Sequence, residues 1–390
     1  MSPIHSQAPT QAALRMPMPM PVPEPMPAPM PMPMPVPMPM PAHTLVQLTG
    51  NGGGGVRDYL ACLQAAWAAR GRSTEVLALS ETLVGQASLA TRLLQCAGDG
   101  PCTLLLHFSG YGFHPRGLCQ WLAREVEDAR RVMGARLRVV TMFHELFASG
   151  PPWGSAFWLS RVQAGIAARV ARASDAVWTN SQHHAQWLQP KTRPGTPLHV
   201  RPVFSTIGEP QAIPPTALRQ RRLVVFGSAS TRARALQALP RHAATLRAQG
   251  ITELLEVGSG ASAAWHHPAL QHRHMGHLDE AALHQLLTSS AYALIDYPSI
   301  HLGKSTVFAA YAVHGCVVLN TAAPGPDADG LLAGLHHHTL GQTGSLWHAE
   351  PQGMASAARQ WYAQHTLAVQ AREFAQLCGL HFEEDLVDAR

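Results

Sequence analysis

The stretch RRLVVFGS at residues 221–228 decides the fold that the sequence predicts. It is typical of an apolar strand that ends in Gly-Ser, and it follows an irregular, proline-containing segment at 202–215. After residue 228, further apolar runs alternate with helical patterns along the sequence, as in a parallel sheet with right-handed crossovers. We expect strands at 252–260, 291–299 and 316–320, and a last long helix at about 354–377.

The same alternation also precedes this stretch. Residues 102–110, CTLLLHFSG, form an unbroken apolar run, as expected for a strand that is covered on both faces. Other strands are expected at 43–50, 74–80, 136–145 and 175–181. Two such series predict an α/β fold with two Rossmann-like domains that face each other across a cleft. The expected domains are an N-terminal domain at 43–205, a linker at 206–220 and a C-terminal domain at 221–390.

Residues 1–42 differ from the rest in composition. Proline occupies nearly every second position from Met16 to Pro41, and proline has no backbone N–H to donate. We expect this segment to be an extended, disordered tail outside both domains.

Composition narrows the classes of function. Hydrophobic residues make up 46% of the chain and charged residues 14%, which is enough apolar material for two cores. The net charge of +5 suits anionic ligands or an anionic membrane surface, without the dense basic stripe that nucleic-acid binding needs. Six cysteines without a C-x-x-C pair favour a cytoplasmic protein. The histidines lack the spacing and partners of a zinc site, so we expect no metal.

HLGKST at 301–306 ends like a phosphate-binding P-loop. The full pattern requires a glycine where this chain has Pro298, so the P-loop of a nucleotide hydrolase is excluded. A glycine, a cation and two hydroxyls at the start of a helix can still bind an anion. The residues of this predicted site are Gly303, Lys304, Ser305 and Thr306. The alternative is an ordinary helix N-cap beside a solvated lysine.

Polar residues also follow other predicted strands, at the sheet edge where α/β proteins bind ligands. Ser228, Arg232 and Arg234 follow the strand at 221–228, and an arginine there could bind phosphate with two hydrogen bonds. Solvated helix arginines are the alternative. His144 ends the strand at 136–145, where it could contact a ligand or bond to the backbone.

GNGGGGVRDYL at 50–60 satisfies the G-x-G-x-x-G pattern between a strand and a helix. The matching glycines are Gly50, Gly52 and Gly55, and dinucleotide binding at this loop would make the chain an NAD(P)-dependent oxidoreductase. A flexible turn that a substrate can approach is the other interpretation.

These segments together resemble GT-B glycosyltransferases of the retaining, family-4-like group. The resemblance spans nearly all of the body and is carried by GGGGVRDYL (52–60), VVTMFHE (139–145), ASDAVWTNS (173–181), LLEVGSG (254–260) and residues 276–320. It implies that His144 approaches the transferred sugar and that the glycines at 53–55 face the donor diphosphate and acceptor. It also implies that the residues at 303–305 bind the diphosphate, and that the closing helix crosses back to the first domain.

The chain departs from the family at two positions, where Leu302 and Ala310 replace the usual glutamates. The resemblance implies a glycosyltransferase of cell-surface polysaccharide assembly, with His144 and Lys304 as catalytic residues. Its partners would be a nucleoside-diphosphate sugar, a glycan or lipid-linked acceptor and the inner membrane surface, without a further cofactor. The missing glutamates keep a catalytically degenerate binding protein as an alternative.

Overall fold

The computed structural model describes residues 43–51, 54–148, 150, 153–260, 267–340 and 350–380. The predicted tail at 1–42 lies outside the described residues. Among the described residues, no helix has the length and apolar content that a membrane crossing requires.

The first half contains a six-stranded parallel sheet with strand order β2-β1-β3-β4-β5-β6. Its strands are β1 (Thr44–Gly50), β2 (Glu75–Leu79), β3 (Cys102–Phe108), β4 (Leu137–Phe143), β5 (Ala176–Thr179) and β6 (Leu198–Val200). The helices are α1 (Gly55–Ala68), α2 (Glu81–Gln86), α3 (Leu89–Ala97), α4 (Gly110–Phe113), α5 (Gln120–Met133), α6 (Ser155–Ala173) and α7 (Gln182–Leu188).

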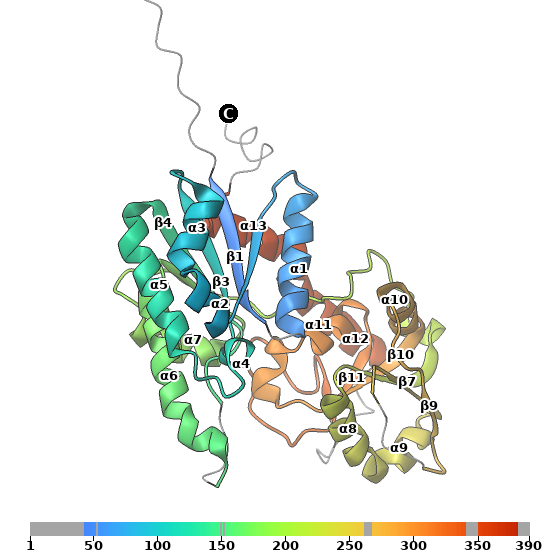
Figure 1. Ribbon diagram of the computed structural model, residues 1–390. Helices are drawn as coiled ribbons and strands as arrows, with labels where there is room; N and C mark the ends of the chain where they lie inside the picture. Colours follow the sequence, from blue (N-terminus) through green and yellow to red (C-terminus); the bar gives the residue numbers. More distant parts are fainter. Residues whose placement is uncertain are drawn as a thin grey trace, which may run out of the picture. The chain divides into compact units, whose positions relative to one another are not determined.

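Helices cover both faces of this sheet (Figure 1). Alternate side chains of a strand point to opposite faces, so Leu104 and Leu106 of β3 pack with α3, α5 and α6, whereas Leu105 packs with α1. This two-sided burial explains why the strand reads as an unbroken apolar run.

The second half contains another six-stranded parallel sheet, with strand order β12-β11-β10-β7-β8-β9. Its strands are β7 (Gln220–Phe226), β8 (Glu253–Val257), β9 (Gln271–His274), β10 (Ser290–Ile295), β11 (Val317–Asn320) and β12 (His338–Thr339). The helical elements are α8 (Ala229–Ala238), α9 (Ala243–Ala248), α10 (Glu280–Ser289), the 3₁₀ segment η5 (Ser299–Lys304), α11 (Thr306–Val313), α12 (Pro351–Ala363) and α13 (Leu367–Leu377).

Two parallel Rossmann-like sheets confirm the predicted fold class. Strand order reverses between β1 and β3 in the first sheet and between β7 and β10 in the second, and ligands of such sheets bind beyond the carboxyl ends at these points. The domain boundaries at 205, 206–220 and 221–390 remain predictions.

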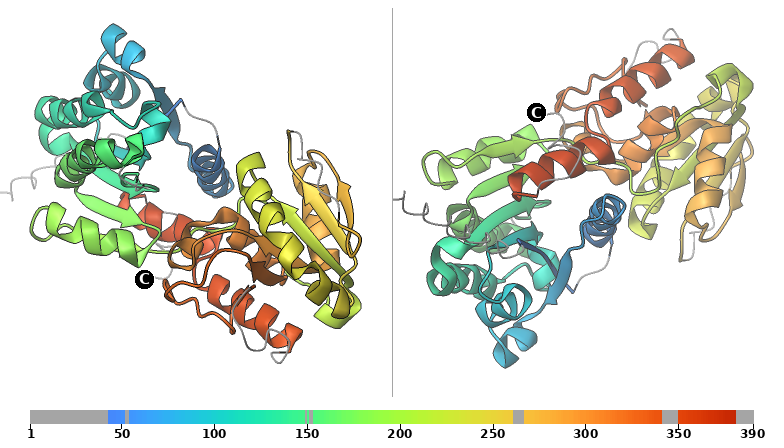
Figure 2. Two further views of the ribbon diagram at one scale, coloured as in Figure 1. Left: turned by 90° about the horizontal axis from the view of Figure 1, so that it is seen from below. Right: turned by 90° about the horizontal axis from the view of Figure 1, so that it is seen from above.

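The last helical segment differs from the single helix that we expected. It is two helices, α12 and α13, because Thr366 begins α13 by accepting a hydrogen bond from the Val369 N–H. The second of them packs on the first half, beside α1 (Figure 2). The Trp67 indole donates to the Ala371 carbonyl at 2.8 Å, and the Trp178 and Phe374 rings stack at 4.1 Å. The chain therefore returns to its first half before residue 380.

Candidate functional site

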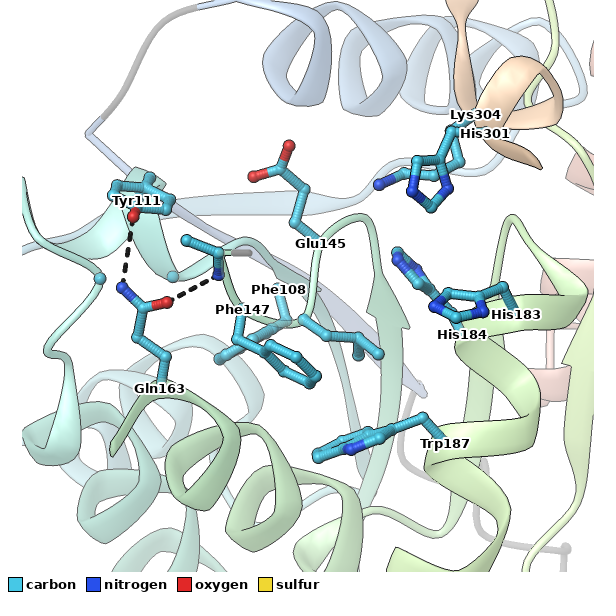
Figure 3. Close-up of a pocket in the computed structure, with 14 residues that line it drawn as sticks. Phe108, Tyr111, Glu145, Phe147, Gln163, His183, His184, Trp187, His301 and Lys304 are labelled. Carbon is cyan, nitrogen blue, oxygen red and sulfur yellow. Dashed lines mark hydrogen bonds between the residues drawn. The ribbon is translucent and has the colours of Figure 1, made fainter. Parts of the chain in front are cut away.

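Residues of both halves line a cavity of about 360 Å³ at the carboxyl ends of β3, β4 and β5 (Figure 3). The first half supplies an aromatic side, with Phe108, Phe147 and Trp187, and a polar side, with Tyr111, Glu145, Gln163, His183 and His184. The second half supplies His301 and Lys304 from η5. The cavity lies beyond the carboxyl ends of these three strands, on one side of the point between β1 and β3 where the strand order reverses.

Gln163 fixes the polar side of the cavity. Its side chain is buried, accepts a hydrogen bond from the Ala148 N–H at 2.7 Å and donates to the Tyr111 hydroxyl at 3.3 Å. It also donates to the Arg116 carbonyl at 2.8 Å, so α6 holds the loops that follow β3 and β4. Sequence reasoning missed Gln163, because one amide inside a helical pattern carries no signal of such contacts.

Lys304 extends into this cavity toward the side that holds Glu145 (Figure 3). Burial lowers the pKa of Lys304, and the carboxylates of Glu145 and Asp329 oppose that shift. Burial also lowers the pKa of His184, to about 3, and lowers that of His301. These two imidazoles are therefore neutral at pH 7, so Lys304 is the group of η5 that can bring a positive charge to this end of the cavity.

Ser305 caps the helix behind Lys304, as the N-cap alternative for this motif requires. Its hydroxyl accepts a hydrogen bond from the Phe308 N–H at 3.1 Å, and Thr306 is the first residue of α11. The predicted site residues Lys304, Ser305 and Thr306 thus sit at the start of this helix, whose N-terminus favours an anion.

Gly303 is buried, and it allows η5 to pack closely against the segment that contains Asp329. A Cβ added here would lie 2.8 Å from Asp329 Oδ2, closer than real side chains approach. The Gly303 carbonyl accepts a hydrogen bond from the Val203 N–H at 2.9 Å, which joins η5 to the first half. These contacts explain the glycine in Gly-Lys-Ser-Thr without a phosphate, so diphosphate binding by Gly303 remains a prediction.

Asp329 is a carboxylate that the sequence did not single out. Its φ of 55° lies in the left-handed region, where a residue other than glycine is uncommon. Oδ1 accepts a hydrogen bond from the Gln182 N–H at the start of α7, at 2.7 Å, whereas Oδ2 is buried without a partner among the described residues. Burial raises the pKa of Asp329, against that hydrogen bond and the charges of His183 and Lys304. Asp329 therefore joins the two halves behind Lys304.

His144 lies behind the cavity and is not part of its lining. Its Nε2 lies 3.2 Å from Nδ1 of His107, and its ring meets the Tyr59 ring edge-on at 5.0 Å. Burial lowers the pKa of His144 well below its usual value, and the charges of His107 and Lys304 lower it further. Burial thus keeps the His144 side chain neutral, and the predicted contact with a sugar remains a prediction.

The turn after β7 contains Ser228, which caps α8. The Ser228 hydroxyl accepts a hydrogen bond from the Thr231 N–H at 3.3 Å and lies 2.9 Å from the Thr231 hydroxyl. A Cβ added at the preceding Gly227 would lie 3.3 Å from Val307 in the first turn of α11. Ser228 and the start of α11 therefore border the same point of strand-order reversal.

Arg232 is enclosed by protein groups, which differs from the exposed phosphate contact that we expected. Its guanidinium pairs with Glu256 at 2.8 Å and donates to the carbonyls of Gly227 and Ser259, at 2.6 and 3.0 Å. It thus ties the ends of β7 and β8 together. Arg234 is half exposed and pairs with Asp296, after β10, at 3.2 Å. Of the two arginines, Arg234 is the one beside solvent at the switch point.

The glycine-rich turn is described in part. Gly53 lies outside the described residues. Gly54 has a φ of 99°, is exposed, and accepts hydrogen bonds at its carbonyl from the N–H groups of Arg57 and Asp58. Gly55 begins α1. Gly50 is needed for packing, because a Cβ there would lie 2.0 Å from the Gly112 carbonyl oxygen.

Metal-ligating side chains do not gather in the part of the chain that the structure describes: no group of three or more histidine, cysteine, aspartate or glutamate side chains there could hold an ion.

Comparisons with known proteins identify the fold. No protein-family model matches the chain, and no curated protein matches it. Among solved structures, trehalose-6-phosphate synthase OtsA aligns at 10% identity with a TM-score of 0.55, over 86% of this chain and 99% of that one. The lipopolysaccharide outer core galactosyltransferase WaaB, in its apo form, aligns at 10% identity with a TM-score of 0.50, over 86% and 98%.

The chain has the GT-B glycosyltransferase fold. The chain spans a smaller share of two other matched structures. It covers 59% of a chain in the GtfA/B complex, at 12% identity and with a TM-score of 0.48 over 74% of this chain. It covers 55% of the pneumococcal O-GlcNAc transferase GtfA. Leu302 and Ala310, the two positions where the sequence resemblance led us to expect glutamates, are both buried in the core of this GT-B chain.

Proposed function

We propose that this GT-B protein transfers a sugar from a nucleoside-diphosphate sugar to a glycan or lipid-linked acceptor. The observation that carries the proposal is the position of Lys304, which projects from the second half into a cavity walled by strand ends of the first half. A cation at that place can neutralise a diphosphate that departs from a sugar held between the halves.

The donor would bind the second half, with its diphosphate between the Ser228 turn and the start of α11. Both are helix N-termini, where backbone N–H groups and the helix dipole attract anions. Lys304 would stabilise the charge on the diphosphate as the bond from the anomeric carbon to phosphate breaks. The departing phosphate oxygen takes the electron pair of that bond and can accept the acceptor's proton.

The acceptor would bind the first half. Phe147 and Trp187 offer aromatic surfaces for the apolar face of a sugar ring, while Glu145 and the fixed Gln163 offer hydrogen-bond acceptors and donors to hydroxyls. His144, neutral and held by His107, would contact the transferred sugar as a hydrogen-bonding group and not as a cation.

The finer parts of the proposal follow from the sequence resemblance. They are retention of anomeric configuration, a role in cell-surface polysaccharide assembly, and a cytoplasmic protein in peripheral contact with the inner membrane surface. A second candidate is a GT-B protein that binds donor without turnover. The observation in its favour is that apolar core residues, Leu302 and Ala310, stand where the family has glutamates.

Titration with UDP, GDP and NADH, followed by donor turnover, tests these functions. We expect binding of UDP or GDP, and Lys304→Ala is expected to weaken it by about 1.5–3 kcal/mol, the range for a hydrogen bond to a charged group. Lys191→Ala is the matched control, since Lys191 is the other lysine of the chain and lies outside the cavity lining.

Unchanged nucleotide affinity in Lys304→Ala would remove the assigned role of this lysine. Binding of NADH in place of UDP and GDP would favour the oxidoreductase alternative. Nucleotide binding without turnover of any donor would favour the degenerate binding protein.

A further inference from the structure

Large apolar side chains are exposed at the start of α6 and just before it. Trp153 is 87% exposed and Trp158 is 71% exposed, and Phe157 and Val162 are each 42% exposed. The Phe157 and Trp158 rings meet edge-to-face at 5.3 Å. We call Trp153, Phe157, Trp158 and Val162 the aromatic face.

This surface is not an extension of the protein core. The opposite side of α6 is the buried one, with Gln163, Ile166, Ala167 and Val170 facing the sheet. Four large apolar side chains exposed within residues 153–162 are costly to leave in water, and such groupings on a protein surface usually mark a binding partner.

The charges around the aromatic face favour an anionic partner. Among the three arginines of α6, which contains no acidic residue, Arg161 is the one beside the aromatic face, whereas Arg169 pairs with Glu127 at 2.6 Å farther along the helix. Arg161 is exposed and follows Trp158 by three positions, so it lies beside that ring on the same side of the helix. Tryptophan rings with arginines beside them match the boundary between the headgroups and acyl chains of a bilayer.

The aromatic face is also close to the candidate site. The same helix supplies Gln163, which lines the cavity and bonds to Tyr111 and Ala148. A surface bound to the solvent side of α6 would therefore lie about one helix diameter, roughly 10 Å, from the cavity.

We propose that the aromatic face of α6 binds the surface of an anionic phospholipid bilayer. Trp153 and Trp158 enter the boundary of headgroups and acyl chains, and Arg161 pairs with lipid phosphate. The bilayer then presents a lipid-linked acceptor to the cavity. Only this last step depends on the proposed glycosyltransferase function; the binding itself does not.

Sedimentation with vesicles tests the proposal on the full chain. The vesicles are phosphatidylcholine alone or with about 30% phosphatidylglycerol. We expect sedimentation with the anionic vesicles, at least about tenfold weaker binding for the double variant Trp153→Ser and Trp158→Ser, and a smaller loss for Arg161→Gln. Leu218→Ser is the control, because Leu218 is 79% exposed but lies away from α6, at the start of the second half.

Three outcomes would overturn the proposed binding to a bilayer. In the first, the wild type sediments with neither kind of vesicle, and in the second, the double variant binds vesicles as well as the wild type does. In the third, the wild type is a dimer without lipid and the double variant is a monomer. The last result would make the aromatic face a contact between copies. Turnover of donor with a water-soluble acceptor should be equal in wild type and double variant, so a failure of the glycosyltransferase proposal would be seen separately.

Discussion

Between pH 7 and pH 5 the free energy of unfolding is expected to fall by on the order of 5–10 kcal/mol, enough to unfold a typical domain. The cause is a set of buried histidines. Burial lowers the pKa of each below the usual 6.5: to about 3 for His107, His184 and His365, and to about 4 for His314 and His337.

The sign follows from proton uptake. Well above pH 6.5 these histidines are neutral in the folded and in the unfolded chain, so they do not change the free energy of unfolding. As the pH falls below 6.5, the unfolded chain binds protons that the folded chain does not bind until its own pKa values near 3 to 4 are reached. Each histidine then favours unfolding by about 1–2 kcal/mol at pH 5.

Urea unfolding measures the effect when it is followed by far-UV circular dichroism at pH values of about 7.5, about 6 and about 5. We expect the urea midpoint to drop at each step, and the drop to be smaller in His184→Gln by roughly the share of one histidine. A midpoint that stays constant from about pH 7.5 to about pH 5 would mean that these imidazoles are not held neutral in the folded chain.

Arg232→Ala is expected to lower the free energy of unfolding by about 3–5 kcal/mol. Arg232 and Glu256 have side chains that are 1% and 2% exposed, so the variant leaves a buried carboxylate without its arginine. Arg234→Ala is the matched control two residues away. Arg234 is 51% exposed and its pair with Asp296 should contribute about 0–1 kcal/mol.

Urea unfolding at about pH 7.5 compares these variants. The double variant Arg232→Met with Glu256→Leu should regain part of the loss, since neither charge of the pair remains; the regain is partial because Glu256 also lies 3.0 Å from His272 Nε2. Equal and small effects of Arg232→Ala and Arg234→Ala would show that the pair is not buried as described.

The apolar strands were predictable because a strand that is buried on both faces needs apolar residues at successive positions, as in residues 102–110. Three short strands were missed. Residues 271–274 read QHRH, with no apolar residue, and the strand at 338–339 has two polar residues. These and the strand at 198–200 lie at the ends of the sheets, where hydrogen bonding to one neighbour replaces hydrophobic patterning.

The candidate site was predictable in place but not in detail. The start of a helix, which is local information, pointed to Lys304, which lines the cavity, and to Ser305, which caps α11. Asp329 could not, because its contacts with Gln182 and Gly303 join segments that are far apart in the sequence. The buried ion pair of Arg232 with Glu256 also required the structure, because the sequence of a helix that contains Arg232 and Arg234 does not show which arginine faces a buried glutamate.

The most direct test of the central claim is a crystal structure of the protein with the nucleoside diphosphate that the titration shows to bind. We expect the diphosphate between the Ser228 turn and the start of α11, with a phosphate oxygen within hydrogen-bond distance of Lys304 Nζ. A diphosphate bound instead at the Gly54–Gly55 turn, without contact to Lys304, would contradict the proposed donor site.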